Sequence, residues 1–303
     1  MKVITPPIKS QGIKTKLVPA IMNLVPNYSG RWIEPFLGTG VVAFNSGAKK
    51  ALLSDINPHL IQFYARLQSK EITPLAIQQF LYREGEKLRV ADENGAAYYK
   101  EVRNRFNTSF DSLDFLFLSR AGFNGMIRFN KNGKWNIPFC KKPERFVQSY
   151  ITKIVHQTEN CLAQMTTDWQ FENKDFREII SQATENDFIY CDPPYAGRYA
   201  DYYSNWTAQD ETDLFDLLKN TKAKFILSSW HHNDFRYNEN IAKYEAAFSV
   251  RTQEHFYFAG AKEVNRNSIV EALVLNYEPV LKVVQTGLKM QSVLFPELEK
   301  EFA

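Results

Sequence analysis

The sequence predicts an α/β fold, in which a mostly parallel sheet is covered by helices on both faces. Along most of the 303 residues, continuous apolar segments typical of buried strands alternate with amphipathic segments. Between about residues 60 and 165 this alternation stops, and apolar residues recur at a spacing near 3.6. The interruption predicts a mostly helical lobe inserted into the sheet domain.

The strands are predicted in two groups, one on each side of the insertion. Before it, residues 31–36 and 51–55 read as strands, and residues 41–47 between them as the start of a helix. Within it, LIQFYARLQS and ITPLAIQQFLYREGEKL have helical spacing. After it, five segments predict strands: 169–176, 187–192, 224–230, 249–258 and 271–277. One interpretation of residues 280–303 is an appended helix.

Composition favours a cytoplasmic protein without a disulfide framework. With 44% hydrophobic residues, the chain can bury a substantial core. No apolar stretch approaches the roughly 20 residues of a membrane span, and the N-terminus lacks the apolar core of a signal peptide. Cys140, Cys161 and Cys191 form no C-x-x-C pair, so we expect packing roles for them. We expect no membrane association.

Positive charge is concentrated between Arg120 and Phe146. This segment has seven Lys and Arg residues and one acid, Glu144, whereas the whole chain carries a net charge of only +3. The pairs Asn124-Gly125 and Asn132-Gly133 predict exposed loops and short hairpins. Phenylalanine and tryptophan interleaved with cations suit stacking on nucleic-acid bases. The alternative is a solvated basic hairpin.

A glycine motif follows the first predicted strand. Residues 34–40 read EPFLGTG, and with Ala43 they fit G-x-G-x-x-A at the mouth of a helix. Such glycines allow a tight turn and a close backbone approach to a nucleoside cofactor. Asp55, at the end of the next strand, is placed to accept hydrogen bonds from ribose hydroxyls. This motif alone suits NAD as well as any other adenosine cofactor.

A second motif, Asp192-Pro193-Pro194-Tyr195, follows another apolar strand. The prolines fix the backbone and remove two N–H donors, so the turn presents only acceptors beside an aromatic ring. A planar amine that donates both hydrogens while its ring stacks on Tyr195 fits this corner. Asp192 and the Pro193 carbonyl would orient the amine nitrogen toward an electrophilic methyl group. Positioning of this kind contributes up to roughly 7 to 11 kcal/mol in well-oriented reactions.

From about Lys9 to Tyr277 the chain resembles the Dam-type (alpha-group) N6-adenine DNA methyltransferases. The cofactor motif comes first, the recognition segment R-x-G-F-N-G...N-x-P next, and DPPY last. The resemblance implies a Rossmann-like S-adenosylmethionine-dependent methyltransferase sheet with an inserted DNA-recognition lobe. The catalytic domain would comprise residues 1–60 and 166–303, and the target-recognition lobe residues 61–165.

The resemblance also implies roles for individual residues. Residues 9–14, KSQGIK, look like the family's K-W-x-G-x-K, with Ser10 as a departure from the tryptophan. The implied catalytic residues are Asp192, Pro193, Pro194 and Tyr195. The implied cofactor-binding residues are Ser10, Lys14, Glu34, Phe36, Gly38, Gly40, Asp55, Asp175, Phe176 and Asp192. The implied DNA-binding residues are Lys9, Arg120, Phe123, Asn124, Arg128, Lys131, Lys134 and Pro138.

The implied function is methyl transfer from S-adenosylmethionine to N6 of adenine in double-stranded DNA, with the base flipped out of the helix. A monomer would suffice, and a cognate restriction endonuclease acting on the same site would fit a restriction-modification role. The alternatives are N4-cytosine methylation, an RNA or protein-glutamine methyltransferase, a DNA-binding regulator with an inactive fold, and a nicotinamide oxidoreductase. We expect no metal, because the reaction needs none and His231-His232 has no third ligand at metal spacing.

Two further residue groups are less specific. Tyr199, Tyr202, Tyr203 and Trp206 fit either a lid over the flipped base or a packing helix. Residues 266–268, Arg-Asn-Ser, resemble a late family motif that would line the cofactor or substrate site.

Overall fold

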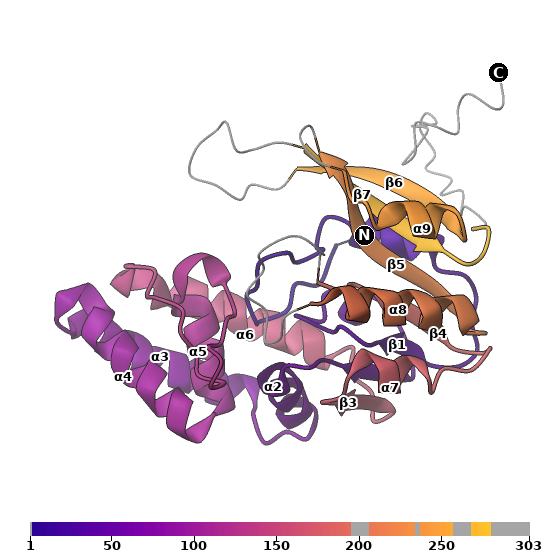
Figure 1. The fold of residues 1–303 in the computed structure, drawn as a ribbon. Helices are drawn as coiled ribbons and strands as arrows, with labels where there is room; N and C mark the ends of the chain where they lie inside the picture. Colours follow the sequence, from indigo (N-terminus) through magenta and orange to yellow (C-terminus); the bar gives the residue numbers. More distant parts are fainter. Residues whose placement is uncertain (1, 195–205, 234–236, 257–267, 280–303) are drawn as a thin grey trace, which may run out of the picture.

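A seven-stranded sheet forms the centre of the computed structural model, which describes residues 2–194, 206–233, 237–256 and 268–279 (Figure 1). The strand order is β3-β2-β1-β4-β5-β7-β6. The strands are β1 (Trp32–Glu34), β2 (Ala51–Ser54), β3 (Trp169–Glu172), β4 (Phe188–Cys191), β5 (Lys224–Asn233), β6 (Ser249–Phe256) and β7 (Ser268–Leu275). The first five are parallel, and β7 runs antiparallel to both β5 and β6. The predicted mostly parallel sheet is confirmed.

The strands that precede the two motifs are neighbours in this sheet. β1 pairs with β4 in parallel, with Trp32 opposite Phe188 and Ile33 opposite Ile189. The residues that follow these strands therefore emerge side by side at the carboxyl edge. Open α/β sheets bind their ligands at this edge.

Helices cover both faces, as the alternating pattern predicts. Helices α7 (Phe176–Ile180), α8 (Ala208–Asn220) and α9 (Ile241–Glu245) pack on the face that carries Ile33 and Ile189. The opposite face, which carries Trp32 and Tyr190, is covered by α1 (Val18–Leu24) and α2 (Pro58–Gln68). Because side chains alternate along a strand, each sheet face contributes its own apolar layer.

Four further helices form a lobe beside the sheet (Figure 1). They are α3 (Pro74–Val90), α4 (Ala96–Ser109), α5 (Ser112–Ala121) and α6 (Gln148–Leu162). Thr73 and Asp111 cap α3 and α5 by accepting backbone N–H bonds. The basic segment between α5 and α6 consists of loops, short 3₁₀ turns and two isolated bridges, as its turn residues predict.

Two expected elements differ from the structure, and two lie partly or wholly outside the described residues. Residues 41–47 form only a 3₁₀ turn over Ala43–Asn45. The strand expected over 169–176 ends at Glu172, because Asp175 accepts the N–H of Arg177 and starts α7. The end of the expected strand 249–258, beyond Phe256, lies outside the described residues, as does the appended helix expected over 280–303.

A buried carboxylate holds the lobe helices together. Glu84 of α3, 1% exposed, accepts hydrogen bonds from Tyr98 Oη at 2.6 Å and from Arg105 Nη2 at 2.8 Å. Arg105 also pairs with Asp114 of α5. Burial alone would raise the pKa of Glu84, but bonds from Tyr98, Arg105 and Arg83 lower it to about 2. The group is therefore charged in the folded protein across the ordinary pH range.

Glu84→Gln should lower the free energy of unfolding by about 3 kcal/mol at pH 7, because the hydrogen bonds and ion pairs that lower the pKa of Glu84 from 4.5 to about 2 are made to its charged carboxylate. The folded pKa of Glu84 lies below its ordinary value of 4.5, so its contribution is complete above that pH and is lost as pH falls toward 2. The difference between wild type and variant should narrow by about 2 kcal/mol at pH 3, measured by urea unfolding. A difference that stays constant would contradict this account. Glu86→Gln, on the exposed side of the same helix, is the control.

Candidate active site at the carboxyl edge of the sheet

The glycine motif forms a tight turn directly after β1. Gly38 and Gly40 have φ values of +51° and +76°, in the region that favours glycine. A Cβ atom on Gly40 would lie 2.7 Å from Phe44 Cε2, so this position has no room for a side chain. A Cβ on Gly38 would meet nothing within 4 Å, so the backbone there is open to a ligand.

Asp55, after β2, is fixed beside this turn. Its Oδ2 accepts the N–H of Gly38 and its Oδ1 that of Asn57, both at 2.8 Å. Burial raises the pKa of Asp55, and the two backbone bonds oppose the shift. Each carboxylate oxygen can accept a further bond, so the arrangement fits a ribose diol.

Three aromatic rings line the next part of the edge. Phe36 and Phe176 stack with their ring centres 5.3 Å apart, and Trp206 lies 5.6 Å from Phe36 and 5.4 Å from Phe176. Asp175 precedes Phe176 and caps α7. Rings and a carboxylate next to a glycine turn suit an adenine. The sequence interpretation did not assign Trp206 to this group, because its partners are remote in sequence.

Asp192 forms an ion pair with Lys14 at the end of β4. The distance from Lys14 Nζ to Asp192 Oδ1 is 2.8 Å, and the two side chains are 5% and 23% exposed. Burial raises the pKa of Asp192, Lys14 lowers it, and Glu271 raises it, with a net upward shift. Pro193 is buried and Pro194 is half-buried. Tyr195, the last residue of the predicted catalytic motif, lies outside the described residues.

Buried polar side chains lie beneath Asp192 on the same sheet face. Glu34, Tyr190, Ser228 and Glu271 are each at most 1% exposed. Glu34 accepts the Trp32 indole N–H at 2.8 Å, and burial raises its pKa well above the ordinary value. Glu34 was expected to contact the cofactor. Because protein encloses its carboxyl group, Glu34 instead lies beneath Asp192.

Ser10 and Gly12 lie in the segment that leads to Lys14. The Ser10 hydroxyl donates to the Gln11 carbonyl at 3.1 Å, and Gly12 has a φ of +75° with open space where a Cβ would be. The backbone at Gly12 is thus open to a ligand.

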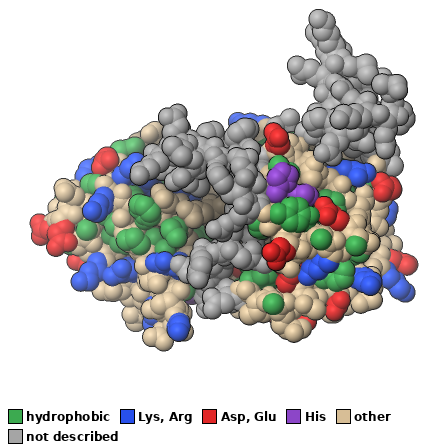
Figure 2. Space-filling view, turned by 45° about the horizontal axis from the view of Figure 1, so that its top comes forward, with side chains coloured by type: hydrophobic (Ala, Val, Ile, Leu, Met, Phe, Trp, Pro, Cys, Tyr) green, Lys and Arg blue, Asp and Glu red, His purple; other side chains and the backbone are tan. Residues whose placement is uncertain are grey.

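Part of the basic segment is exposed on the lobe. Lys131 and Asn124 are exposed, Phe123 is 48% exposed, and Pro138 is exposed while its carbonyl accepts the Phe123 N–H. Lys9 lies against Gly125, whose Cβ position is 2.8 Å from Lys9 Cγ. In Figure 2, Lys and Arg side chains surround an apolar area on the lobe.

Two of the predicted DNA contacts are engaged within the protein. Arg128 Nε donates to Asn136 Oδ1 at 2.9 Å. Lys134 donates to the Asn107 carbonyl and lies 5.0 Å from the centre of the Phe110 ring. The Lys134 contact connects the basic segment to α4, whereas the Arg128 bond lies within the basic segment.

The structure buries Arg120, contrary to the prediction that it binds DNA. It was expected on the DNA-facing surface but is only 5% exposed. Its guanidinium donates to the Pro7 carbonyl and to Gln157 Oε1, both at 2.6 Å, and burial lowers its pKa. Arg120 therefore joins the N-terminal segment to α5 and α6, and its donors are not presented to a phosphate.

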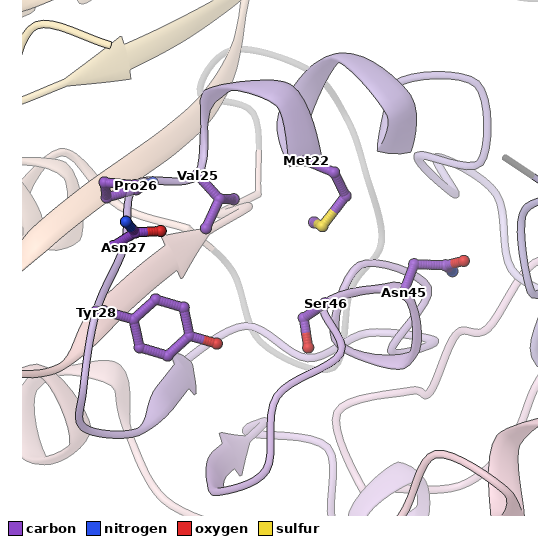
Figure 3. A pocket seen from close by; sticks show the side chains of 7 residues that line it. All are labelled: Met22, Val25, Pro26, Asn27, Tyr28, Asn45 and Ser46. Carbon is purple, nitrogen blue, oxygen red and sulfur yellow. The ribbon is translucent and has the colours of Figure 1, made fainter. Parts of the chain in front are cut away.

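A separate cavity of about 350 Å³ lies between α1, the segment that leads into β1 and the turn after the glycine motif (Figure 3). Its lining residues are Met22, Val25, Pro26, Asn27, Tyr28, Asn45 and Ser46. The Asn45 side chain already bonds Ile4 and Val41. This cavity is at the amino side of the sheet, away from both motifs.

His231 and His232, at the end of β5, share a hydrogen bond between their Nδ1 atoms, and His231 Nε2 lies 3.0 Å from Glu245. Within the described residues, no cluster of three or more His, Cys, Asp or Glu side chains has the arrangement of a metal site. The helices of the described part are all too short or too polar to cross a membrane.

Comparison with known proteins places this geometry in a family. The model of the D12 class N6 adenine-specific DNA methyltransferases matches residues 10–262. A DNA adenine methylase of Vibrio cholerae is 33% identical over 229 residues, which cover 71% of this chain and 76% of that protein. A DNA adenine methylase of Haemophilus influenzae is 32% identical over 244 residues, covering 76% and 80%. The type II methyltransferase M1.LlaDCHI of Lactococcus lactis is 25% identical over 287 residues, covering 90% and 96%.

The matched residues include both motifs and the lobe between them. They also include strands β1 and β4, whose pairing brings the two motifs together. The chain therefore belongs to the D12 class of N6 adenine-specific DNA methyltransferases.

Proposed function

We propose that the protein transfers a methyl group from S-adenosylmethionine to N6 of an adenine that is flipped out of duplex DNA. The observation that carries the proposal is the position of Asp192. It lies at the end of β4, beside the glycine turn of β1, in a corner whose two prolines offer no N–H donor.

The residues around the glycine turn fit the nucleoside part of this cofactor. Gly38 and Gly40 would give it backbone access, Asp55 would hold the ribose, and Phe36 with Phe176 would enclose the adenine beside Asp175. Ser10 and Lys14 lie toward the catalytic end. When bound, the cofactor supplies an electrophilic methyl group on a sulfonium.

Asp192 would act by orienting the substrate amine. A carboxylate accepts several hydrogen bonds, so Asp192 can hold Lys14 and an adenine amino group together. The amine, fixed by Asp192 and the Pro193 carbonyl, would point its lone pair at the methyl group, and Tyr195 would stack on the adenine. The gain is mainly one of positioning.

The exposed part of the basic segment would bind the DNA. Flipping a base costs a few kcal/mol, and contacts of cations with phosphates offset this cost. Lys131, which is exposed, and Lys9, which is half-buried, would contact phosphates or bases. Arg128 and Lys134 each donate a hydrogen bond within the protein. Phe123, exposed beside Asn124 and Pro138, can fill the space that the flipped base leaves.

In the proposed domain division, residues 1–60 and 166–303 form the catalytic domain. Residues 61–165 form the recognition lobe. A single chain carries both parts, so we propose that a monomer acts on bacterial DNA in the cytoplasm. Relatives that include a type II methyltransferase support a restriction-modification role with a separate endonuclease.

The direct test is transfer of labelled methyl from S-adenosylmethionine to unmethylated bacterial DNA, with mass analysis of the product nucleosides and sequencing of modified positions. We expect N6-methyladenine at one short motif. N4-methylcytosine would keep the mechanism and overturn the base assignment, and no transfer to DNA would overturn both.

Asp192→Ala should reduce kcat by roughly 10²-fold or more, because the amine loses its orienting acceptor. Salt-sensitive DNA binding, measured by fluorescence anisotropy, should stay close to that of wild type. Asp216→Ala, at an exposed position of α8, is the control and should keep full activity. Loss of DNA binding together with activity would count against the assigned role of Asp192.

Lys14→Met should move the acid limb of the kcat–pH profile to higher pH. Asp192 must be ionised to accept the amine, and Lys14 lowers its pKa against the effect of burial. The profile should be recorded at saturating cofactor, so that weaker cofactor binding does not contribute. Lys14→Arg, which keeps the charge, should restore the position of the limb. An unshifted limb in the methionine variant would show that Lys14 does not set the ionisation of Asp192.

Lys131→Ala should weaken DNA binding to a similar extent for different sequences and reduce the slope of log Kd against log salt by about 1. The side chain is exposed on the proposed DNA face. Lys219→Ala, exposed in the last turn of α8, should leave the slope unchanged. Equal slopes for wild type and both variants would remove Lys131 from the interface.

A further inference from the structure

Arg177 directly follows the two residues that are proposed to hold the cofactor's adenine. Its Nη1 donates to both carboxylate oxygens of Asp175 at 3.2 Å, and its backbone N–H donates to Asp175 Oδ1 at 2.9 Å. Its guanidinium carbon lies 4.4 Å from the centre of the Phe176 ring. One side chain therefore contacts both the carboxylate and the ring of this part of the site.

The same guanidinium reaches across to α8. Nε donates to Asp213 Oδ2 at 2.7 Å, and Nη2 donates to Asp210 Oδ1 at 2.6 Å. Asp210 also completes the capping box of α8, in which its carboxylate accepts from Thr207 and its N–H donates to the Thr207 hydroxyl. Arg177 thus links the first turn of α7 to the first turn of α8.

We propose that Arg177 is a positioning residue for cofactor binding, which fixes Asp175 and Phe176 against the α8 terminus. This inference rests on the proposed function, since Asp175 and Phe176 are its adenine-binding residues. Helix α7 has only five residues, too few to hold its own N-terminus in place. The planar fork of an arginine can bind several carboxylates in fixed directions, which a lysine cannot do.

The charges around Arg177 explain why its loss would disturb Asp175 and Phe176. Three carboxylates, those of Asp175, Asp210 and Asp213, surround this one guanidinium. Without the cation they would repel one another, and Asp175 would turn away from the direction that an adenine amine requires. The Phe176 ring would lose the planar group stacked on it.

Binding of S-adenosylhomocysteine to the full-length protein, measured by calorimetry, tests the proposal. Arg177→Gln should raise Kd about tenfold, as expected for the loss of an interaction with a charged group. At saturating S-adenosylmethionine, kcat should stay within about twofold of wild type, because Arg177 does not touch the reacting atoms. Arg177→Lys should recover part of the affinity, since it restores the charge without the fork.

Arg31→Gln is the matched control. Arg31 has a similar exposure, 28% against 35%, and pairs with the Asp187 carboxylate at 3.0 Å at the amino end of the sheet. We expect it to lower the melting temperature without changing Kd. An unchanged Kd in Arg177→Gln, or an equal change in Arg31→Gln, would overturn the inference. A folded wild type that fails to bind S-adenosylhomocysteine would instead overturn the proposed cofactor, and the inference with it.

Discussion

The ion pair between Lys14 and Asp192 is the contact on which the arrangement of the candidate active site depends. It brings the N-terminal segment to the end of β4, where Asp192, Pro193 and Pro194 follow the strand. Because both groups are largely buried, neither could be charged there alone without a large desolvation cost. The pair therefore fixes the position of the N-terminal segment, and Lys14 opposes the upward shift that burial imposes on the pKa of Asp192, the proposed acceptor of the substrate amine.

The same N-terminal segment connects the sheet with the helical lobe. Arg120 of α5 donates to the carbonyls of Pro6 and Pro7, and Lys9 lies against Gly125 in the basic segment. Further along, Lys14 reaches Asp192. A short stretch of chain thus touches the proposed DNA-binding hairpin at one end and the proposed catalytic corner at the other. In the proposed function, the geometry of this stretch sets the distance between the DNA-binding surface and the catalytic residues.

The place of a site residue in the fold can be predicted from the sequence where it follows from strand order and residue type. The motifs after β1 and β4 are brought together because both strands are apolar, parallel and adjacent, and parallel strands end at the same edge. Prediction from the sequence fails for long side chains whose partners are remote. Arg120 carries the same charge as Lys131, yet its acceptors lie 113 residues away at Pro7 and 37 residues away at Gln157. No local pattern distinguishes a buried arginine from an exposed one. The contacts of Trp206 with Phe36 and Phe176, and those of Arg177 with Asp210 and Asp213, were not predicted for the same reason.

A layer of buried polar side chains lies under Asp192. Glu34, Asp192 and Glu271 lie on one sheet face, with Lys14 as the cation paired to Asp192. Three ionised carboxylates beside one ammonium would leave a net negative charge in a medium of low polarity, which is costly. The upward pKa shifts of Glu34 and Asp192 are the response to this cost. The two groups differ in their surroundings, because Glu34 accepts the neutral indole N–H of Trp32, whereas Asp192 pairs with the ammonium of Lys14. The layer thus sets a cation beside Asp192, the carboxylate to which the proposed function assigns the substrate amine.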